Sequence, residues 1–384
     1  MSEAYLIGGL RTPIGKTNGI LKGFLPEQLA AGVLQEIISR YGLAPQDIDQ
    51  VILGNAVGPG GNIARVAVLE AGWPYACPAL TVDTQCGSGL SAVELAVAQI
   101  RSGQAELVIA GGVESTSMAP RRQFNVNDPR FAGEAAFYEQ APFSPPAVGN
   151  PGVGEAAEAL ARQLDISRED MDKLALLSHK KACQARERKV LKDIILPLAW
   201  QGTILRDDEC LRDNMSSRLL ARMKGAFAAG GRITAGNACL KHDGAAAVLI
   251  ASRAAMQRRG LRPGACIAGT VSTGCDPNVF PLGPVNAIRR LLDKQGLRPE
   301  QLDAIEINEA FAVKILACCR ELGLCLEKVN QLGGALAYGH PYGASGAMIL
   351  LHLLTVLEQG EGRFGAAAIG AVGGIGVAVL LERC

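Results

Sequence analysis

The sequence lacks the features that mark several broad classes of protein. No run of apolar residues approaches the roughly 18 that a membrane-spanning helix needs. Lys and Arg number 38 against 37 Asp and Glu, so neither sign of charge is in excess for binding a nucleic acid or a membrane surface. The length of 384 residues, 48% of them hydrophobic, is ample for a large core. We therefore expect a soluble, cytoplasmic globular protein with no nucleic-acid and no membrane partner.

Signals for metal binding and for disulfides are also missing. The four histidines are far apart in the sequence and have no zinc-ligand spacing relative to the cysteines. The 11 cysteines are irregularly spaced and include no C-x-x-C. This pattern favours free thiols in a reducing compartment over a disulfide framework. We expect no metal and no redox cofactor.

One cysteine, Cys86, has an unusual local sequence. It lies in "DTQCGSGL" (83–90), after a segment of strand-forming residues, Pro78–Thr84, which we expect to be a buried strand. An amphipathic helix follows it and is predicted to end at Gly103. A helix N-terminus favours a thiolate, which is the nucleophilic form of cysteine. The segment indicates either a reactive thiol or a small residue packed in the core.

The chain repeats itself, which predicts a duplicated α/β architecture. The segments "LAPQDIDQVILGNAVG" (43–58) and "LRPEQLDAIEINEAFA" (297–312) share a Leu-x-Pro start and a strand pattern, at an offset of 254 residues. The glycine turn and helix at Cys86 have a counterpart in "GHPYGASGAMILLHLLTVL" (339–357). Alternating strand and helix patterns imply mixed or parallel sheets covered by helices. A region of different composition, 119–235, separates the two halves.

A cysteine nucleophile needs a base and a group that stabilises a developing oxyanion. His340 lies on the glycine turn that corresponds to the Cys86 turn, which makes it the candidate base. In duplicated α/β folds, ligand sites form where strand ends of both halves meet, so the two turns are expected at one cleft. Asn308 and Glu309 end a predicted strand, where they either orient a water or a carbonyl or cap the strand end.

The sequence resembles the thiolase family over essentially its whole length. The resemblance rests on six motifs in the family's order and spacing: "RTPIGK" (11–16), "QCGSGL" (85–90), "GGVESTSMAP" (111–120), "TAGNA" (234–238), "NEAFA" (308–312) and "GHPYGASGA" (339–347). It implies a five-layered αβαβα fold of two duplicated βαβαβαββ halves and an inserted loop domain that carries much of the coenzyme A contact. It further implies a homodimer or homotetramer.

The family pattern also implies domains and residue roles. The N-terminal half would span 1–118 and be completed by 236–260, the loop domain 119–235, and the C-terminal half 261–384. Cys86 matches the acyl-accepting nucleophile, His340 its activating base and oxyanion-hole member, and Asn308 the holder of a catalytic water. The lining of the pantetheine tunnel would include four residues: Phe227, Ala235, Ala310 and Phe311.

The sequence departs from the family at four places. Gly370 stands where the family's second cysteine, the acid/base for the α-proton, belongs, and Val372 replaces a glycine whose N–H helps build an oxyanion hole. Cys239 replaces the serine after "TAGNA", and "NPGVG" (150–154) replaces a His-Met-Gly substrate contact. Three substitutes for the missing base are open: a thiol of Cys318 or Cys319, Glu309 or a water on Asn308, or a malonyl thioester activated by decarboxylation.

These residues predict an acyltransferase of the acetyl-CoA C-acetyltransferase type, with a role in fatty acid or lipid metabolism. Cys86 would take an acyl group from an acyl-CoA, and a second acetyl-CoA, as its α-carbanion, would attack the acyl-enzyme. The reverse direction is thiolysis of a 3-ketoacyl-CoA, and coenzyme A enters only as part of the substrate. The alternatives are a decarboxylative Claisen condensing enzyme, an acyl-CoA hydrolase, and a catalytically silent coenzyme A-binding subunit.

Overall fold

The strands form two matched sets that meet at one short pairing. The computed structural model describes residues 3–138 and 140–384. The first set has the order β4-β3-β5-β8-β1, with β1 Ala4–Arg11, β3 Gln50–Gly54, β4 Ala79–Val82, β5 Leu107–Glu114 and β8 His242–Ser252. The second has the order β10-β11-β12-β9, with β9 Ala265–Gly274, β10 Ala304–Ile307, β11 Phe364–Ala371 and β12 Ile375–Arg383. Pairing of β1 with β9 joins them into one path, and the short strand β2 (Gly15–Lys16) pairs with β8.

Strand directions repeat between the two sets, as the sequence repeat predicts. In each set one parallel pair (β3 with β5, β10 with β11) is followed by two antiparallel pairs. A one-turn 3₁₀ helix precedes each of the matched strands: η1 (Pro45–Asp47) before β3, and η4 (Pro299–Gln301) before β10. The counterpart of β4 is reduced to a single parallel bridge between Ile305 and Val329.

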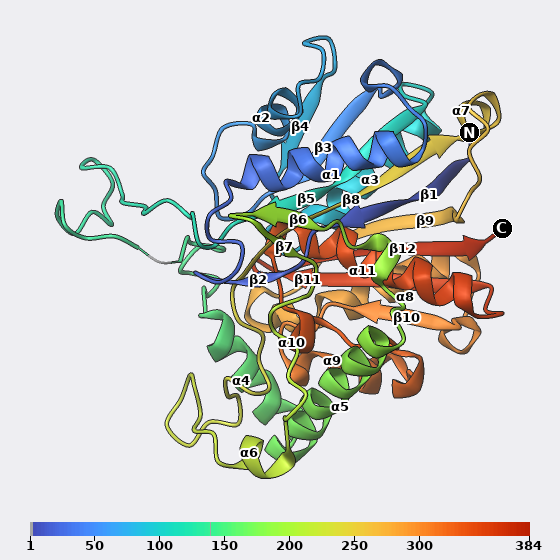
Figure 1. The fold of residues 1–384 in the computed structure, drawn as a ribbon. Coiled ribbons are helices and arrows are strands. Elements are labelled where there is room, and N and C mark those ends of the chain that lie inside the picture. The colour runs from blue at the N-terminus through green and yellow to red at the C-terminus, as the bar shows by residue number, and fades with distance from the viewer. Residues whose placement is uncertain (1–2, 139) are drawn as a thin grey trace.

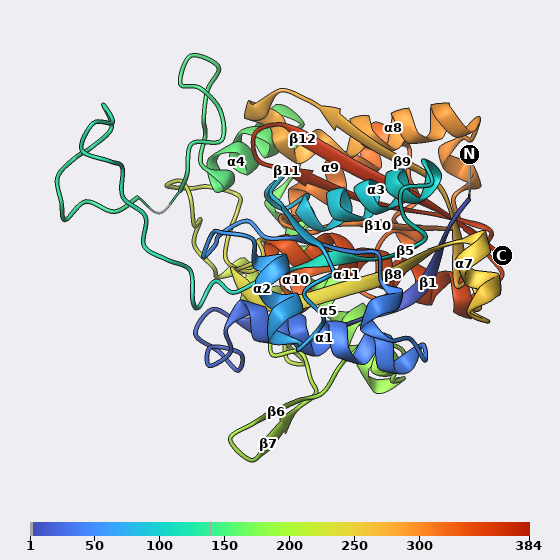
Figure 2. The same cartoon turned by 90° about the horizontal axis from the view of Figure 1, so that it is seen from above.

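Helices occupy three layers, one between the two sets of strands and one on each outer face (Figure 1, Figure 2). The central layer holds α3 (Ser88–Arg101) and α11 (Tyr342–Gln359). One outer face is covered by α1 (Pro26–Arg40) and α2 (Ile63–Glu70), with α7 (Arg253–Arg258) after β8, and the other by α8 (Gly283–Gln295) and α9 (Ala312–Leu322). The αβαβα fold predicted from the sequence is confirmed.

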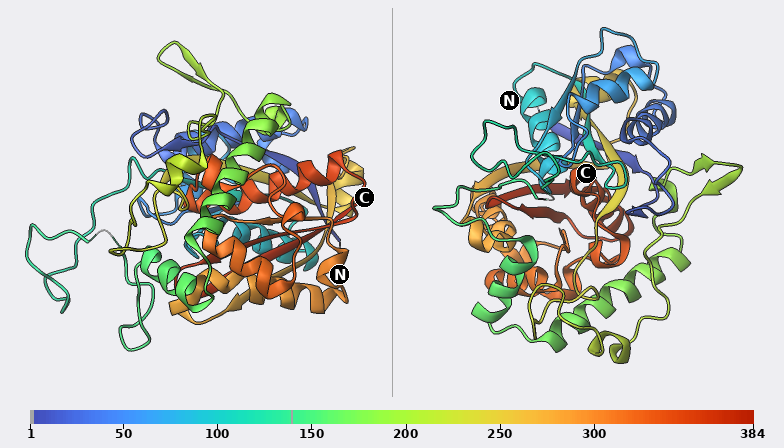
Figure 3. Two further views of the ribbon diagram at one scale, coloured as in Figure 1. Left: turned by 90° about the horizontal axis from the view of Figure 1, so that it is seen from below. Right: turned by 90° about the vertical axis from the view of Figure 1, so that its left-hand side faces the viewer.

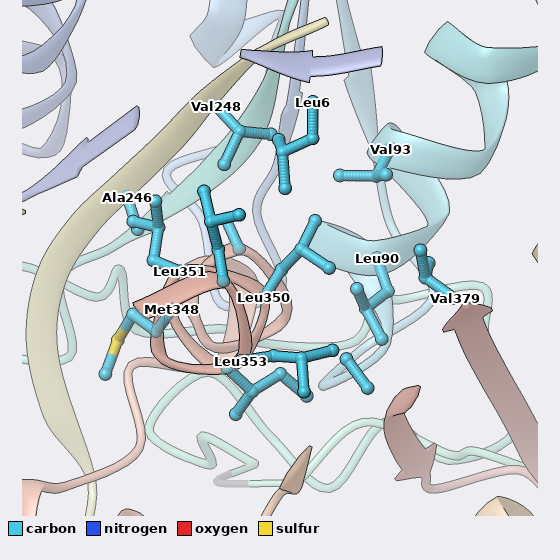
Figure 4. Packing of buried hydrophobic residues seen from close by; sticks show 14 of the residues in the cluster. Leu6, Leu90, Val93, Ala246, Val248, Met348, Leu350, Leu351, Leu353 and Val379 are labelled. Atoms are coloured by element: carbon cyan, nitrogen blue, oxygen red, sulfur yellow. The ribbon is translucent and has the colours of Figure 1, made fainter. Parts of the chain in front are cut away.

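The two central helices touch at their N-terminal turns, and this contact positions the site. Figure 4 shows Leu90 and Val93 of α3 close to Leu350 and Leu353 of α11, with Val248 and Val379 contributed by the two sets of strands. Glycine permits the approach, because a Cβ on Gly346 would lie 2.2 Å from the backbone nitrogen of Leu90. The segments just before α3 and α11 therefore lie side by side.

The insertion packs against both halves. It contains α4 (Val153–Gln163), α5 (Arg168–Glu187), η2 (Lys192–Ile194), β6 (Leu198–Trp200), β7 (Thr203–Leu205) and α6 (Ser217–Ala221). Residues 119–138 and the β6–β7 hairpin extend away from the layered body (Figure 2, Figure 3). A buried ion pair of 2.7 Å between Arg11 and Asp208 ties the insertion to β1. The remaining short elements are η3 (Pro277–Leu282), η5 (Leu326–Lys328) and α10 (Ala335–Tyr338).

Two sequence expectations on single elements have different outcomes. The helix at Cys86 ends as predicted, since α3 stops at Arg101 and Gly103 takes a φ of +75°. The prediction of a buried strand at Pro78–Thr84 is wrong, because β4 lies at the edge of its sheet and Leu80 is 40% exposed. Strand-forming residues occur in edge strands and in central strands alike, so they do not predict whether a strand is buried. Among the helices of the described residues, none is both long and apolar enough to cross a membrane.

Candidate active site

Cys86 lies on a tight turn between β4 and α3. Gln85 takes a left-handed φ of +55°, which folds the chain back just before the thiol. The backbone N–H of Thr84 donates to the Ser88 hydroxyl over 3.0 Å, and that hydroxyl donates to the Gln85 carbonyl over 2.5 Å. These bonds hold Cys86, which is partly exposed, directly before the first turn of α3.

The resting form of Cys86 is the thiol. Burial raises the pKa of Cys86 to about 11, although the ammonium of Lys314 opposes this shift. Backbone hydrogen bonding at Cys86 lowers its pKa, in the direction expected at a helix N-terminus, but burial has the larger effect. Partial charges at one helix end are worth less than the desolvation of a thiolate in an apolar site. Cys86 needs a base to become a nucleophile.

His340 is held in a defined tautomer. It is 1% exposed and precedes α11. Its Nδ1 lies 2.6 Å from the hydroxyl of Ser345, which itself donates to the Pro341 carbonyl, so Nδ1–H is the donor to Ser345. Asn308 Nδ2 donates to Nε2 over 3.3 Å. Burial holds the pKa of His340 well below its usual value, so the ring is neutral and Nε2 carries a lone pair.

The structure brings Cys86 and His340 into one site. The turns before α3 and α11 abut, since a Cβ on Gly89 would lie 2.7 Å from the Gly343 carbonyl. The Tyr342 ring stands edge-on to the His340 ring with 5.0 Å between centroids, and the pKa of Tyr342 is raised by burial first and by the neighbouring Cys86 second. The charge of Lys314 acts on both Cys86 and His340.

Asn308 has one polar atom without a partner. Its Oδ1 is buried and accepts no hydrogen bond from residues 3–138 or 140–384. Asn308 lines a cavity of about 10 Å³ together with Ser345 and His352, whose Nε2 also lacks a partner in these ranges. A cavity of this size has room for one water molecule, although its walls are mostly apolar and offer few polar partners.

A segment from the end of the insertion connects the two loops that carry the other predicted residues. The backbone N–H of Cys239 donates to the Ala310 carbonyl over 3.0 Å, and Lys241 forms a parallel bridge with His340. Ala238 forms an antiparallel bridge with Phe311. Cys239 and Ala310 therefore lie beside the His340 loop, and the pKa of Cys239 is raised by burial first and by the neighbouring Cys86 second.

The predicted pantetheine-lining residues gather at the surface next to this segment. Phe227 is 42% exposed and stands edge-on to Phe311, with 6.1 Å between ring centroids. Ala235 is exposed, whereas Phe311 is 6% exposed and presents little more than an edge. A Cβ on Gly154 would lie 2.1 Å from the Phe227 ring, so the "NPGVG" segment needs glycine where it passes Phe227.

Gly370 and Val372 lie at the end of β11. A Cβ on Gly370 would lie 2.7 Å from Pro284 Cδ and 3.0 Å from the Phe280 carbonyl, so a cysteine there fits only if the start of α8 shifts. Val372 is 6% exposed and packs in an apolar cluster with Phe280 and its neighbours. Its φ lies outside the left-handed region, so valine causes no backbone strain.

The three side chains considered as substitutes for the missing cysteine have other environments. Cys318 is 0% exposed, and burial raises the pKa of Cys318 to about 12 and that of Cys319 to about 11. Glu309 accepts hydrogen bonds from Ser178, from Asn330 and from the backbone N–H of Leu336. Its oxygens therefore join α5 and the segment before α10, which is a structural task.

Lys314 was missed by the sequence reasoning. It lies in the first turn of α9 and is 0% exposed, and its Nζ donates to the Gly370 carbonyl over 3.2 Å. The available signal was one charged residue inside the otherwise apolar run "AFAVKILACC" (310–319). A helix pattern does not say whether such a residue faces solvent or the site.

Comparisons with known proteins agree with this geometry. The sequence matches the family described as "Thiolase, N-terminal domain" over residues 4–254 and "Thiolase, C-terminal domain" over residues 261–383. It is 40% identical over 382 residues to "Putative acetyl-CoA C-acetyltransferase YhfS" of Bacillus subtilis (strain 168), covering 99% of both chains.

Two solved structures are similar over the whole chain. The crystal structure of the Bacillus anthracis acetyl-CoA acetyltransferase has a TM-score of 0.95 and 36% identity, covering 100% of this chain and 99% of that one. The crystal structure of human mitochondrial 3-ketoacyl-CoA thiolase in complex with CoA has a TM-score of 0.93 and 34% identity, covering 100% and 98%.

Proposed function

The chain belongs to the thiolase family of acyltransferases, and we propose that Cys86 carries the acyl group during the reaction. An acyl-CoA transfers its acyl group to Cys86. A second acyl-CoA then condenses with the acyl-enzyme to a 3-ketoacyl-CoA, or the same steps run in reverse as thiolysis. The single observation that supports this most strongly is a thiol of raised pKa on the turn that abuts the turn of a neutral histidine, whose Nε2 accepts only a long hydrogen bond of 3.3 Å from Asn308.

The first step follows from those two groups. His340 Nε2 takes the proton of Cys86 as the sulfur attacks the thioester carbonyl, so an S–H bond breaks and an S–C bond forms. The C–S bond to coenzyme A then breaks, and the proton on His340 passes to the departing thiolate. General base catalysis of this kind contributes roughly 10² to 10⁴ in rate.

The oxyanion of this step needs hydrogen-bond donors, and three candidates are at hand. They are protonated His340, a water held by the Oδ1 of Asn308, and the backbone N–H of Val372. The unpartnered Oδ1 supports the water role of Asn308. The burial of the Val372 side chain in an apolar cluster leaves only its backbone for this task.

The substrate class proposed is an acyl-CoA. The exposed Phe227 ring and its contact with Phe311 offer an apolar wall for a pantetheine chain. Ala235, Ala310 and Cys239 are small residues along the same wall. No resident cofactor is part of this proposal, because coenzyme A arrives with the acyl group.

We also propose a homodimer or homotetramer in the cytoplasm. The open edge of β4, with Leu80 40% exposed, supports self-association, because an unpaired strand edge is a template for pairing with another chain. The domain division into 1–118 with 236–260, 119–235 and 261–384 is likewise a proposal. Within 119–235, α4 and α5 pack into the apolar core of the C-terminal half.

The test is incubation with acetyl-CoA followed by intact-mass measurement. We expect one acetyl group on the parent protein, none on Cys86→Ala, and an unchanged adduct on Cys325→Ser, which changes an exposed thiol elsewhere. No adduct on the parent would reject the proposal. Release of free coenzyme A without condensed product would indicate a hydrolase, and tight binding without turnover, unchanged in Cys86→Ala, a silent subunit.

One observation favours a second candidate, decarboxylative condensation. Position 370 has no thiol and no room for one without a shift of the start of α8. Formation of acetoacetyl-CoA from malonyl-CoA plus acetyl-CoA, but not from acetyl-CoA alone, would select this candidate.

A further inference from the structure

Lys314 is fully buried, which is unusual for a lysine. Its side chain is 0% exposed, and among the described residues its ammonium has a single hydrogen bond, to the Gly370 carbonyl, and no carboxylate as an ion-pair partner. It is the third residue of α9, where the helix dipole also disfavours a positive charge. Lysine is almost never fully buried unless it is paired. Stability therefore does not explain this residue.

The surroundings of Lys314 are the proposed reaction site. The titratable groups near it are the thiols of Cys318, Cys86, Cys239 and Cys275, contributed by four different segments, and its charge also acts on His340. Burial lowers the pKa of Lys314, which makes the neutral amine accessible. A neutral amine is a base, and its conjugate ammonium is an acid.

Lys314 also lies at the place where a base is missing. Its Nζ is 3.2 Å from the carbonyl oxygen of Gly370, the residue at the family's acid/base cysteine position. The Cβ of a cysteine at 370 would point toward the Phe280 carbonyl and Pro284, whereas the Lys314 amine approaches residue 370 at its carbonyl oxygen. A thiol at 370 and the Lys314 amine are therefore alternative groups at the same end of β11. Cys318, Cys319 and Glu309 are engaged elsewhere, as described above.

We propose that Lys314 is the acid/base that moves the α-proton in the carbon–carbon bond-forming step. This inference rests on the proposed function. In condensation, the neutral amine takes a proton from the α-carbon of the second acyl-CoA, so a C–H bond breaks and an N–H bond forms. The electron pair released forms the C–C bond to the thioester carbonyl on Cys86. The C–S bond to Cys86 breaks, and the ammonium returns its proton to the thiolate.

The first experiment separates the two steps in Lys314→Met, which keeps the length of the side chain and removes the amine. We expect acetylation of Cys86 by acetyl-CoA to change less than about tenfold, while condensation and deuterium uptake from D₂O at C2 of acetyl-CoA fall by roughly 10² to 10⁴. The matched control is Lys181→Met. Lys181 is only half-buried but likewise donates to a backbone carbonyl, over 2.9 Å to Val329, and both rates should stay near those of the parent.

A purely structural role for Lys314 predicts other results. It predicts a lower melting temperature and a parallel loss of both steps, whereas the proposal predicts an unchanged or higher melting temperature, since an unpaired buried amine is removed. Lys314→Met that condenses or exchanges within about tenfold of the parent overturns the proposal. A parent that acylates but neither exchanges nor condenses overturns it too and leaves acyl transfer to Cys86 standing. A parent that does not acylate rejects the proposed function instead.

Chemical rescue and pH dependence provide a second test if Lys314→Met folds poorly. In Lys314→Ala, added ethylamine or propylamine should restore condensation in proportion to its concentration, without changing Cys86 acetylation. In the parent acetyl-enzyme, condensation should rise with pH as Lys314 loses its proton, and this limb should be absent in Lys314→Ala. The other titratable groups near Lys314 should not produce this limb. Acetylated Cys86 has no proton to lose, burial raises the pKa values of Cys239, Cys275 and Cys318, and His340 is already neutral. No rescue and an unchanged pH profile would overturn the assignment.

Discussion

The turns before α3 and α11 occupy equivalent places in the two halves, but they differ in their surroundings. Cys86 is partly exposed, and hydroxyl groups fix only the backbone around it. His340 is 1% exposed, and both of its ring nitrogens have hydrogen-bond partners. This difference in exposure and hydrogen bonding means that one duplicated turn keeps a thiol accessible to substrate, while the other fixes a base in one tautomer.

The ends of the matched strands β3 and β10 show the same division. After β3, Asn55 donates to the carbonyl of Val113 and to the carboxylate of Glu114, which also accepts from the backbone N–H groups of Ala56 and Gly343. After β10, Asn308 donates to His340 and leaves Oδ1 unpaired among the described residues. The N-terminal asparagine completes a structural network, whereas the C-terminal one faces the chemistry.

The largest effect should come from the turn that carries the thiol. Cys86→Ala removes the nucleophile, so turnover of acetyl-CoA should fall by at least about 10⁴-fold. Turnover by Cys325→Ser, measured by chromatography of acetoacetyl-CoA, should match the parent. A Cys86→Ala protein that retains a tenth of the activity would contradict the assignment of the nucleophile.

The next largest effect concerns the insertion, which only the N-terminal half contains. Asp208→Asn leaves Arg11 buried without its carboxylate, and breaking a buried pair costs about 3–5 kcal/mol. Urea denaturation should show this loss. Arg253→Ala, which removes an exposed ion pair with Glu3, should leave the midpoint unchanged. Equal effects of the two variants would mean that the Arg11–Asp208 pair does not anchor the insertion.

Substitution of the two asparagines should change different properties, turnover for Asn308 and stability for Asn55. Asn308→Ala should slow turnover by roughly 10²-fold with little change in melting temperature, because it positions a base and a water. Asn55→Ala should cost about 1–3 kcal/mol in stability, because it leaves buried hydrogen-bonding groups unpaired, and should keep the turnover of the folded fraction. Steady-state kinetics and thermal melting of both variants test the comparison, and a reversed pattern would refute the division between the halves.

The last comparison concerns the pH dependence of the free thiol in the Cys86 turn. Because the pKa of Cys86 is raised to about 11, the thiolate fraction increases with pH and is complete only above that value. Alkylation of Cys86 by iodoacetamide should therefore accelerate about tenfold per pH unit between pH 7 and 10. Removal of the nearby positive charge in Lys314→Met should slow it further. A rate that levels off near pH 7 would indicate a thiolate in the free protein.

Much of the fold and part of the site could be predicted from local sequence. The repeat at 43–58 and 297–312 gives matching 3₁₀ turns and strands, and the glycine turn places Cys86 at a helix start. The exposure of β4 could not be predicted, since apolar residues suit an edge that pairs with another chain as well as a central strand. The reduction of the strand at Val329 to one bridge had no local signal either.

The sequence by itself determined the duplicated fold, the two glycine turns and the residue types that stand on them, because these depend on neighbours along the chain. Only the tertiary structure decided the charge states and the companions of those residues. It showed that burial raises the pKa of Cys86 and lowers that of His340, that His340 Nδ1 lies against the Ser345 hydroxyl, and that Lys314 reaches the Gly370 carbonyl. Desolvation and the field of nearby charges depend on which remote segments surround a group, and a local pattern contains no record of them.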